Sequence, residues 1–321
     1  MTRVVVTDAD VGPLLRDGDG IDLVRVALDD RALLEDELAR ADAYVGVHFD
    51  AGLARAVGPA FAFLQITAAG TDHVAVGDLP ARVTVANAYG HGRSVAEHVL
   101  MVMIAARRGL LRRDAEMRRG RWRSRLHDPD CPTFSTLAGA TVGIIGFGHI
   151  GRSIARLCDA IGMRTVALRG SARGRDATDP DAAWVGGADA LDDLLREAAV
   201  VVVACPLTDR TRGLIGAREL ALLGPSGTLV NVGRGAVVDE AALYEALRDR
   251  TIAAAAIDVW TAPPGTVPAL AGLDNVIMTP HYSATADDTY RDRAAQVAAN
   301  ILRVHRGEPP HHIVRQGEPA V

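Results

Sequence analysis

The sequence predicts an α/β protein with two doubly wound domains, each built on a parallel sheet. Short apolar strand patterns alternate with helical patterns almost throughout the chain, which is typical of parallel sheets. The chain has 321 residues, which is enough for two domains with hydrophobic cores of their own. We expect one domain to comprise residues 1–94 and 286–321, and the other to comprise residues 95–285.

Five strand patterns and two helical patterns belong to the first expected domain. The strands are expected at 4–7, 23–27, 43–47, 63–67 and 83–86. Residues 30–40 form an amphipathic helical pattern with Leu33, Leu34 and Leu38 on one face. The last helical pattern, 287–306, comes after the second set of strands, and we expect it to cross back to this domain.

A long helical pattern at 94–118 separates the two sets of strands. Its first half is mostly apolar, which indicates a helix buried in a core or in a subunit contact, so we expect a homodimer. Residues 120–135 have the composition of a loop. The second set of strands is expected at 141–145, 164–168, 200–204, 228–231, 254–258 and 276–278, with helices at 191–198 and 240–248.

The composition limits the classes of function. Hydrophobic residues make up 49% of the chain and charged residues 23%, as in ordinary globular proteins. A formal net charge of -5 argues against a general nucleic-acid binder, which needs a basic surface. Neither an apolar run of the ~20 residues that span a bilayer nor a signal peptide is apparent, so no membrane association is predicted. The scattered cysteines Cys131, Cys158 and Cys205 indicate neither a disulfide framework nor a metal site, and a cytoplasmic location is expected.

A glycine-rich segment carries the strongest functional signal. It reads Gly146-Phe147-Gly148-His149-Ile150-Gly151, follows the strand pattern 141–145 and precedes the helical pattern 152–160. Glycines at this spacing allow a tight turn and a close approach of the backbone to a pyrophosphate, and the helix N-terminus attracts the phosphates. This context predicts a Rossmann-type dinucleotide-binding loop in the domain of residues 95–285.

The end of the next strand indicates which dinucleotide binds. A site for NAD(H) usually has Asp or Glu ~20 residues after the glycines, where it binds the ribose 2′-hydroxyl. Here the strand 164–168 is followed by Arg169, Ser171 and Arg173, and the acid is absent. Because guanidinium groups bind phosphate with paired hydrogen bonds, we expect NADP(H) to be preferred. The alternative is that these residues form a solvated loop and that NAD(H) is also used.

With the glycine loop in the middle of the chain, the sequence resembles the D-isomer-specific 2-hydroxyacid dehydrogenases. The resemblance runs from about residue 65 to residue 306. Its pieces, in order, are Ala69-Gly70-Thr71-Asp72-His73-Val74, Ser94-Val95-Ala96-Glu97-His98, Leu137-Ala138-Gly139, the glycine loop, Cys205-Pro206-Leu207-Thr208, Asn231-Val232-Gly233-Arg234-Gly235, Asp258-Val259-Trp260 and Thr279-Pro280-His281.

The resemblance implies an architecture and a role for each matching residue. A Rossmann cofactor domain would be inserted in a flavodoxin-like substrate domain. Arg234 would hold the substrate carboxylate and polarise the carbonyl, and His281 would donate the proton. The backbone N–H groups of Ala69 and Gly70 would bind the carboxylate. Asp258 would contact the nicotinamide carboxamide and Pro206 would line its ring, with Cys205, Val232, His149 and Ile150 as further cofactor-binding residues.

One departure from the family pattern affects the expected catalytic set. The family has a Glu five residues after the Asp, where this chain has Pro263, and no acid occurs between Asp258 and Asp274. The histidine then lacks a carboxylate partner that would stabilise its protonated form. The enzyme could work with Arg234 and His281 alone and a more acidic optimum. Alternatively, a pocket residue (His91, His48 or Tyr89) assists, or the protein binds the cofactor without turning over ordinary 2-keto acids.

His91 is the most interesting of these helpers. It follows Tyr89 and precedes the 94–98 motif, at a point where the loop of the resembling formate dehydrogenases reaches the substrate. These enzymes also lack the Glu, but they have a glutamine near the histidine that this chain lacks. The pair His311-His312 near the C-terminus is expected to be an exposed tail, because two adjacent histidines are a weak metal signal.

These observations lead to one principal expectation and two alternatives. We expect a cytoplasmic, NADPH-preferring reductase of a small 2-keto acid, such as glyoxylate, hydroxypyruvate or a larger analogue, with hydride transferred to the keto carbon. The first alternative is oxidation of a small anion in the manner of formate dehydrogenase. The second is a non-catalytic protein that senses the dinucleotide or acts as a scaffold, as some relatives that are transcriptional corepressors do.

Overall fold

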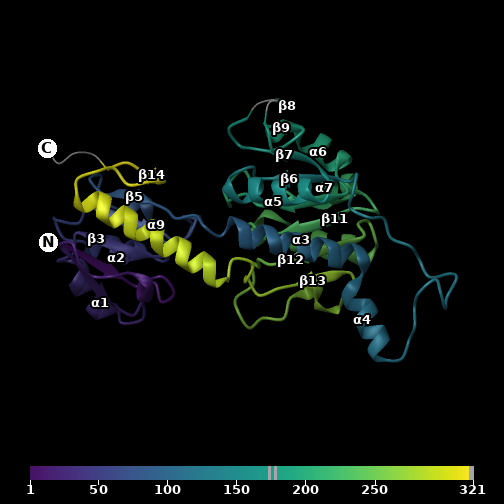
Figure 1. Ribbon diagram of the computed structural model, residues 1–321, viewed down its shortest axis with the longest axis horizontal. Helices are drawn as coiled ribbons and strands as arrows, with labels where there is room; N and C mark the ends of the chain where they lie inside the picture. Colours follow the sequence, from purple (N-terminus) through teal and green to yellow (C-terminus); the bar gives the residue numbers. More distant parts are fainter. Residues whose placement is uncertain (173–174, 177–178, 318–321) are drawn as a thin grey trace. The chain divides into compact units, whose positions relative to one another are not determined.

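The computed structural model describes residues 1–172, 175–176 and 179–317, and its chain divides into two compact units (Figure 1). Unit 1 comprises Met1–His91 and Thr285–Val321, and unit 2 comprises Gly92–Ala284. Each unit contains one mainly parallel sheet with helices, so the predicted α/β fold class with two parallel-sheet domains is confirmed. No helix in the described part of the chain is long and apolar enough to cross a bilayer.

Unit 1 contains a six-stranded sheet with the strand order β14-β5-β4-β3-β1-β2. Its strands are β1 (Thr2–Val6), β2 (Ile21–Arg25), β3 (Ala43–Gly46), β4 (Phe63–Ile66), β5 (Thr84–Ala86) and β14 (Ile313–Arg315). All pair in parallel except β14, which runs antiparallel to β5. The helices are α1 (Arg31–Leu38), α2 (Ala51–Ala56) and α9 (Asp287–His305), with short 3-10 turns at Gly12–Leu14 and Val76–Asp78.

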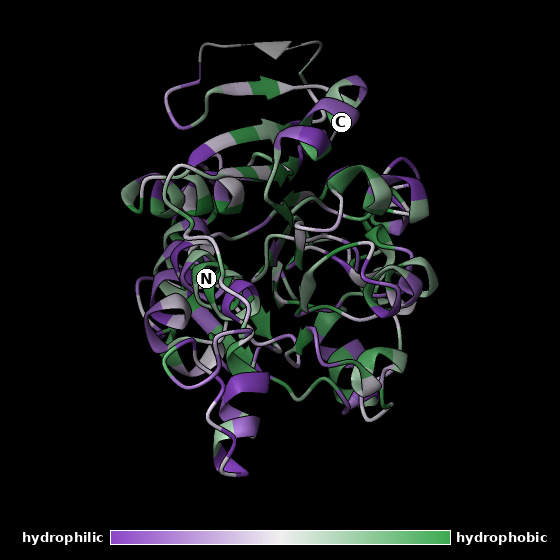
Figure 2. Ribbon diagram, turned by 90° about the vertical axis from the view of Figure 1, so that its right-hand side faces the viewer, coloured by the Kyte–Doolittle hydropathy of each residue, from purple (hydrophilic) through white to green (hydrophobic). Residues whose placement is uncertain are grey.

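The sheet of unit 1 buries both of its faces. In β1, Val5 belongs to one buried apolar cluster, while Val4 and Val6 belong to another. This alternation follows from the period of two along a strand, and it allows helices to cover both faces. Helix α9 contributes Val297 and Ile301 to the second cluster. For the described chain as a whole, Figure 2 shows hydrophobic residues mainly on the central strands and hydrophilic residues mostly on helices and loops.

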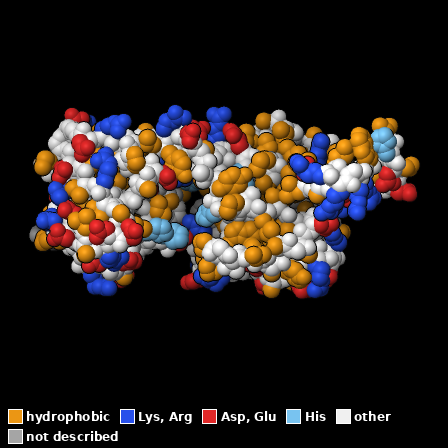
Figure 3. All heavy atoms as spheres, turned by 90° about the horizontal axis from the view of Figure 1, so that it is seen from below, with side chains coloured by type: hydrophobic (Ala, Val, Ile, Leu, Met, Phe, Trp, Pro, Cys, Tyr) orange, Lys and Arg blue, Asp and Glu red, His pale blue; other side chains and the backbone are white. Residues whose placement is uncertain are grey.

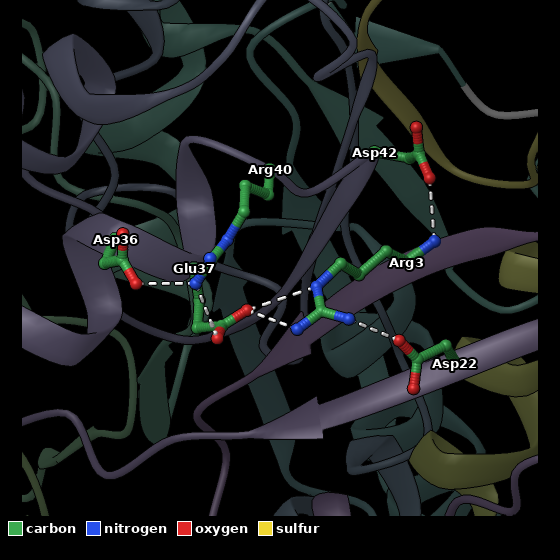
Figure 4. A network of polar contacts seen from close by, with 6 residues as sticks. All are labelled: Arg3, Asp22, Asp36, Glu37, Arg40 and Asp42. Carbon is green, nitrogen blue, oxygen red and sulfur yellow. Dashed lines mark hydrogen bonds and ion pairs between the residues drawn. The ribbon is translucent and has the colours of Figure 1, made fainter.

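Polar contacts fix the ends of the chain within unit 1. The buried Asn300 amide of α9 donates to Gln65 Oε1 at 2.7 Å and to the His311 carbonyl at 3.1 Å, and its oxygen accepts from the His311 N–H at 2.7 Å. Near the N-terminus, Arg3 binds Asp22 of β2 and Glu37 of α1, each at 2.6 Å (Figure 4). The Arg3 guanidinium holds the pKa of Glu37 below its usual value.

Unit 2 contains an eight-stranded sheet with the order β13-β12-β11-β10-β6-β7-β9-β8. Its strands are β6 (Thr141–Ile145), β7 (Arg164–Leu168), β8 (Arg175–Asp176), β9 (Trp184–Gly186), β10 (Val200–Val203), β11 (Thr228–Asn231), β12 (Ala254–Ile257) and β13 (Val276–Met278). The helices are α3 (Gly92–Arg108), α4 (Leu110–Arg118), α5 (His149–Ala160), α6 (Leu191–Glu197), α7 (Ala217–Leu223) and α8 (Glu240–Arg248). Only β8 pairs antiparallel with its neighbour.

The prediction of one long helix at 94–118 was wrong. The segment forms two helices, because Gly109 adopts a left-handed conformation (φ 58°) that ends α3 and starts α4. Helix α3 buries an apolar stripe that includes Val95, Val99 and Met103, whereas α4 buries none of its side chains. The strand expected at 23–27 starts two residues earlier, and α2, α7, β8, β9 and β14 were not predicted.

Candidate active site

The glycine loop joins β6 to α5, and two of its glycines are required by close packing. Gly146 has φ 106°, and a Cβ there would lie 2.5 Å from the Cys205 backbone nitrogen. A Cβ on Gly151 would lie 2.3 Å from the Gly146 carbonyl oxygen. The loop is therefore held against the backbone at Cys205, which is buried, and next to Pro206, which is exposed.

Gly148 differs from these two glycines because it faces open space. No heavy atom of the described residues lies within 4 Å of a Cβ built there, and its φ of -100° is available to any residue. It is the N-cap residue of α5, whose first turn includes His149 and Ile150, and no side chain in the described part of the chain caps this end. An uncapped helix N-terminus beside an unobstructed glycine fits a dinucleotide pyrophosphate.

Two of the residues expected to determine the preference for NADP(H) over NAD(H) follow the end of β7. Arg169 is half-buried, and its Nε is buried without a hydrogen-bond partner among the described residues. Ser171 is exposed, and Arg173 lies outside the described residues. The sequence did not indicate a role for Asp179. Its carboxylate accepts hydrogen bonds from Arg152 and also interacts electrostatically with Arg169. Both arginines lower the pKa of Asp179, Arg152 most strongly through its hydrogen bonds.

Arg234 lies in a tight loop after β11. Asn231 shapes this loop, because its side-chain oxygen accepts from the Gly233 N–H and its amide donates to the Arg234 carbonyl, both at 3.1 Å. A Cβ on Gly235 would lie 2.5 Å from the Trp260 carbonyl carbon, so the loop packs against the segment that follows β12. The Arg234 side chain is half-buried, and Val232 is buried.

Asp258 follows β12 and is 1% exposed. Its Oδ1 accepts from the Thr279 hydroxyl at 2.5 Å and from the Tyr282 N–H at 3.1 Å, and its Oδ2 accepts from the Ser283 N–H at 3.1 Å. Burial alone would raise the pKa of Asp258, but the hydrogen bonds from Ser283, Thr279 and Tyr282 bring it below its ordinary value. The residue is therefore a buried carboxylate that is kept ionised by its donors.

His281 follows β13 and is exposed. It has a left-handed backbone conformation with φ 56°, which is uncommon for a residue other than glycine. Beside it lies a cavity of about 530 Å³ whose walls include Trp260, Ala262, Pro263 and Met278. None of the residues that line this cavity, all of which the structure describes, is acidic.

Six of these segments share one edge of the sheet. The strands β13, β12, β11, β10, β6 and β7 are consecutive neighbours and pair in parallel. Within three residues of the ends of these strands come, in the same order, His281, Asp258, Arg234, Cys205, Gly146 and Arg169. In open α/β sheets, ligands bind outside the carboxyl ends of the strands, so this edge is the candidate active site of unit 2.

The residues expected to bind substrate belong to unit 1. Ala69 and Gly70 follow β4, and the Asn87 amide donates to the Ala69 carbonyl at 2.8 Å. The backbone of Tyr89 is held by Gln296 of α9, whose side chain accepts from its N–H at 3.1 Å and donates to its carbonyl at 2.8 Å. His91 is buried and is the last residue of the first segment of this unit.

The other histidines named from the sequence also lie in unit 1. His48 packs against His73, with 4.9 Å between ring centroids, and burial followed by the charge of His73 lowers the pKa of His48. His311 and His312 are exposed, as expected, but they do not form a tail, because the His311 backbone is bound by Asn300 and β14 follows directly. Among the described residues, no group of three or more His, Cys, Asp or Glu side chains is arranged to hold a metal ion.

Comparison with known proteins identifies the family. Residues 100–283 match the family model described as D-isomer specific 2-hydroxyacid dehydrogenase, NAD binding domain. A glycerate dehydrogenase of Methylorubrum extorquens is 34% identical over 258 residues, covering 78% of each chain. A D-3-phosphoglycerate dehydrogenase of Methanocaldococcus jannaschii is 36% identical over 226 residues, which are 69% of this chain and only 41% of that protein.

The fold is shared over the whole chain with solved structures. An NADPH-dependent glyoxylate/hydroxypyruvate reductase of Sinorhizobium meliloti, solved with citrate, has a TM-score of 0.81 and 25% identity, with 100% of both chains covered. The TT0316 protein of Thermus thermophilus has a TM-score of 0.78 and 28% identity, covering 98% of this chain and 100% of that one. The resemblance seen in the motifs is thereby confirmed, and the chain belongs to the D-isomer specific 2-hydroxyacid dehydrogenase family.

Proposed function

We propose that this protein is an NADPH-preferring reductase that converts a small 2-keto acid to the 2-hydroxy acid. The observation that carries the proposal is the shared edge of the unit 2 sheet. There the glycine loop, Arg169, Arg234, Asp258 and His281 follow neighbouring parallel strands. In this proposal unit 2, which differs by a few residues at each end from the expected domain 95–285, is the dinucleotide-binding domain, and unit 1 is the substrate domain.

The residues of this edge supply the groups that the reaction needs. Arg234 binds the substrate carboxylate with its planar guanidinium and polarises the keto carbonyl as negative charge develops on its oxygen. His281 donates the proton that converts this oxygen to a hydroxyl. The dinucleotide supplies the hydride for the keto carbon when it is bound. The N–H groups of Ala69 and Gly70 bind the carboxylate from unit 1, and His91 and Tyr89 lie in a loop of the same unit.

The preference for NADPH rests on Arg169. Its guanidinium follows β7, at the place where an NAD(H) site has an acid, and its buried Nε has no partner among the described residues. A 2′-phosphate provides acceptors for such a donor. The S. meliloti reductase is named as NADPH-dependent, and a second structure of it contains NADP and malonate. Use of NAD(H) as a second cofactor is compatible with the same loop.

The substrate class rests on the relatives. Their names include glycerate dehydrogenase for the M. extorquens protein and glyoxylate reductase for a Pyrococcus furiosus protein that is 32% identical over 225 residues. These names describe reactions of small 2-hydroxy and 2-keto acids. Arg234 and the Ala69–Gly70 backbone suit the carboxylate that all such compounds share.

We also propose that the protein is a cytoplasmic homodimer. Helix α4 buries none of its side chains within the chain, and Leu110 and Leu111 are 54% and 57% exposed. On α3, Met101 is 50% exposed. Apolar side chains also reach the surface in the view of Figure 3, and exposed apolar side chains such as these three mark a candidate interaction patch. A second copy that presents the same patch covers it with two-fold symmetry.

The three buried, unpaired cysteines suit a reducing compartment, which supports the proposed cytoplasmic location.

The test of the function is cofactor oxidation with short and branched 2-keto acids, using NADPH and NADH in parallel at pH 6 and pH 8. We expect turnover with NADPH, faster at pH 6. The controls are the Arg234→Gln and His281→Gln variants, which should still bind NADPH and turn over at least about 100-fold more slowly. Tight NADPH binding without turnover of any keto acid would contradict the proposal and favour a dinucleotide-sensing protein. Oxidation of formate with no keto-acid reduction would favour the formate dehydrogenase-like alternative.

A further inference from the structure

We propose that His281 is held in its reactive position through its backbone, by a frame of hydrogen bonds on residues 279–283, and that Thr279 is a positioning residue of the site. The proposal rests on the proposed function, in which His281 donates the proton. It concerns how the imidazole is oriented in a chain that has Pro263 where a carboxylate was expected.

The Asp258 carboxylate forms the centre of the frame. It accepts the Thr279 hydroxyl two residues before His281, and the N–H groups of Tyr282 and Ser283 directly after it. Both carboxylate oxygens are used, and the side chain is buried, so the three bonds are shielded from water. Asp258 thus fixes the chain on both sides of His281.

Two further bonds hold the same segment from other elements. The Trp260 indole N–H donates to the Thr279 carbonyl at 2.8 Å. The Ser94 hydroxyl, from the first turn of α3, donates to the Ser283 carbonyl at 2.8 Å. All five bonds of the frame engage Thr279, Tyr282 or Ser283, and none engages the imidazole itself. The frame therefore sets the direction of the ring through the backbone.

The backbone of His281 shows why a frame is needed. Its φ of 56° is left-handed, a conformation that is unfavourable for a residue with a Cβ because the Cβ crowds the backbone carbonyl oxygen. Such conformations persist where the surrounding contacts over-determine them. If one bond of the frame is removed, relaxation of this residue toward an ordinary φ becomes cheaper. The ring would then swing away from its position.

Among the described residues, the cavity beside the imidazole ring provides no carboxylate that could orient it. The cavity beside His281 has Ala262, Pro263 and Met278 among its walls, and none of its lining residues is a carboxylate. A proton donor must lie within hydrogen-bond reach of the oxygen that it protonates. A displacement of about 1 Å at a reacting group can reduce the rate about 100-fold. Backbone positioning therefore bears directly on the rate of the proton-transfer step.

Thr279 offers a clean test, because its hydroxyl can be replaced by a methyl group without a change of charge or shape. We expect Thr279→Val to lower kcat by about 10- to 100-fold. The KM for the keto acid and the Kd for NADPH should change less than about twofold. Thr279→Ser should restore kcat. The matched control is Thr261→Val, which removes an exposed hydroxyl that donates to Glu240 at 3.1 Å and should behave as wild type.

A second readout follows His281 without turnover. In protein with 15N-labelled histidine, the His281 ring signals can be assigned by their loss in His281→Gln. We expect them to shift or broaden in Thr279→Val and to stay unchanged in Thr261→Val. If wild type turns over no keto acid, the proposed function fails, and these signals still decide whether the frame exists.

Two outcomes would overturn the frame. One is a Thr279→Val variant with wild-type kcat and unchanged His281 signals. The other is a variant with a lower melting temperature but unchanged kcat and pH profile, which would show a purely structural role. If Thr279→Val does not fold, Ser94→Ala removes the bond at the other end of the segment, and the same measurements and the same two outcomes apply.

Discussion

The guanidinium of Arg152 donates hydrogen bonds to both carboxylate oxygens of Asp179, at 2.8 and 2.7 Å. Arg152 lies in α5 just after the glycine loop, and Asp179 lies between β8 and β9. The two side chains are 30% and 11% exposed, so this pair is well shielded compared with exposed ion pairs such as Arg118–Asp114. It fixes the segment before β9 to the helix that begins at the glycine loop.

The first prediction concerns the stability of this pair. Asp179→Asn should lower the free energy of unfolding by about 1–2 kcal/mol at pH 7, because two charge-assisted hydrogen bonds are weakened. Arg152 lowers the pKa of Asp179 in the folded protein. The carboxylate therefore contributes stability above its unfolded pKa of about 3.9, and this contribution is lost as the pH falls through the lower folded value.

Urea unfolding at pH 7 and at pH 3 measures this effect. The difference between wild type and Asp179→Asn should shrink at pH 3. A difference of the same size at both pH values would show that the amide acts through packing and not through loss of charge. Asp114→Asn is a control, because its ion pair with Arg118 is exposed on both sides (54% and 78%) and should contribute little.

The second prediction separates two glycines of one loop. Gly146→Ala should destabilise the protein strongly, because its Cβ would lie 2.5 Å from backbone at Cys205 and its φ is 106°. Gly148→Ala should leave the melting temperature unchanged, because its Cβ meets nothing within 4 Å. If the pyrophosphate approaches Gly148, the added methyl group should still weaken NADPH binding by tenfold or more, about 1.4 kcal/mol. Calorimetric titration of Gly148→Ala with NADPH decides this, and wild-type affinity would remove Gly148 from the binding site.

The third prediction tests the choice of dinucleotide. Arg169→Asp should weaken NADPH binding and favour NADH, because the carboxylate repels the 2′-phosphate and accepts hydrogen bonds from the ribose 2′-hydroxyl. The measurement is the ratio of the two dissociation constants. Arg164→Asp, an exposed arginine at the other end of β7 that binds Glu197, is the control for a general change of charge. An unchanged affinity for NADPH in Arg169→Asp would remove Arg169 from the 2′-phosphate site.

The sequence was sufficient to predict most of the fold and the order of the site segments. Buried parallel strands such as Val200–Val203 are continuous apolar runs, and the glycine loop has a fixed spacing, so both can be recognised locally. Gly109 was missed because a single glycine is tolerated inside many helical patterns. Its left-handed φ is a property of the backbone, which the spacing of apolar residues does not reveal.

The contacts of the site could not be predicted, because they join residues far apart in the sequence. Asp179 meets Arg152 from a segment 27 positions away, and no motif marks it. Asp258 was expected to face the nicotinamide, and its bonds to Thr279 and Ser283 depend on the pairing of β12 with β13. Motifs give residue types at known spacings, whereas hydrogen-bond partners follow from the register of neighbouring strands.

The fourth prediction tests the homodimer. Leu111→Glu should convert the dimer to a monomer, because it places a charge in an apolar surface that a second copy would desolvate. The mass measured by light scattering after size-exclusion chromatography reports the change. Leu28→Glu, which alters a comparably exposed leucine (40%) in unit 1, should stay dimeric. A wild-type protein that is monomeric at micromolar concentration would contradict the proposed homodimer, and a dimeric Leu111→Glu variant would exclude α4 from the interface.

The fifth prediction concerns the pH dependence of reduction. Reduction of a keto acid consumes a proton, so His281 must be protonated when it acts as the acid, and the rate should be lower at pH 8 than at pH 6. In the reverse direction the neutral imidazole is the active form, so oxidation of the 2-hydroxy acid should rise over the same range. His281→Gln should lower kcat by roughly 10²- to 10⁴-fold and abolish both trends.

Opposite slopes in the two directions distinguish proton donation from a loss of stability, which would lower both rates together. A flat profile for reduction through pH 8, or an active His281→Gln variant, would show that another group donates the proton.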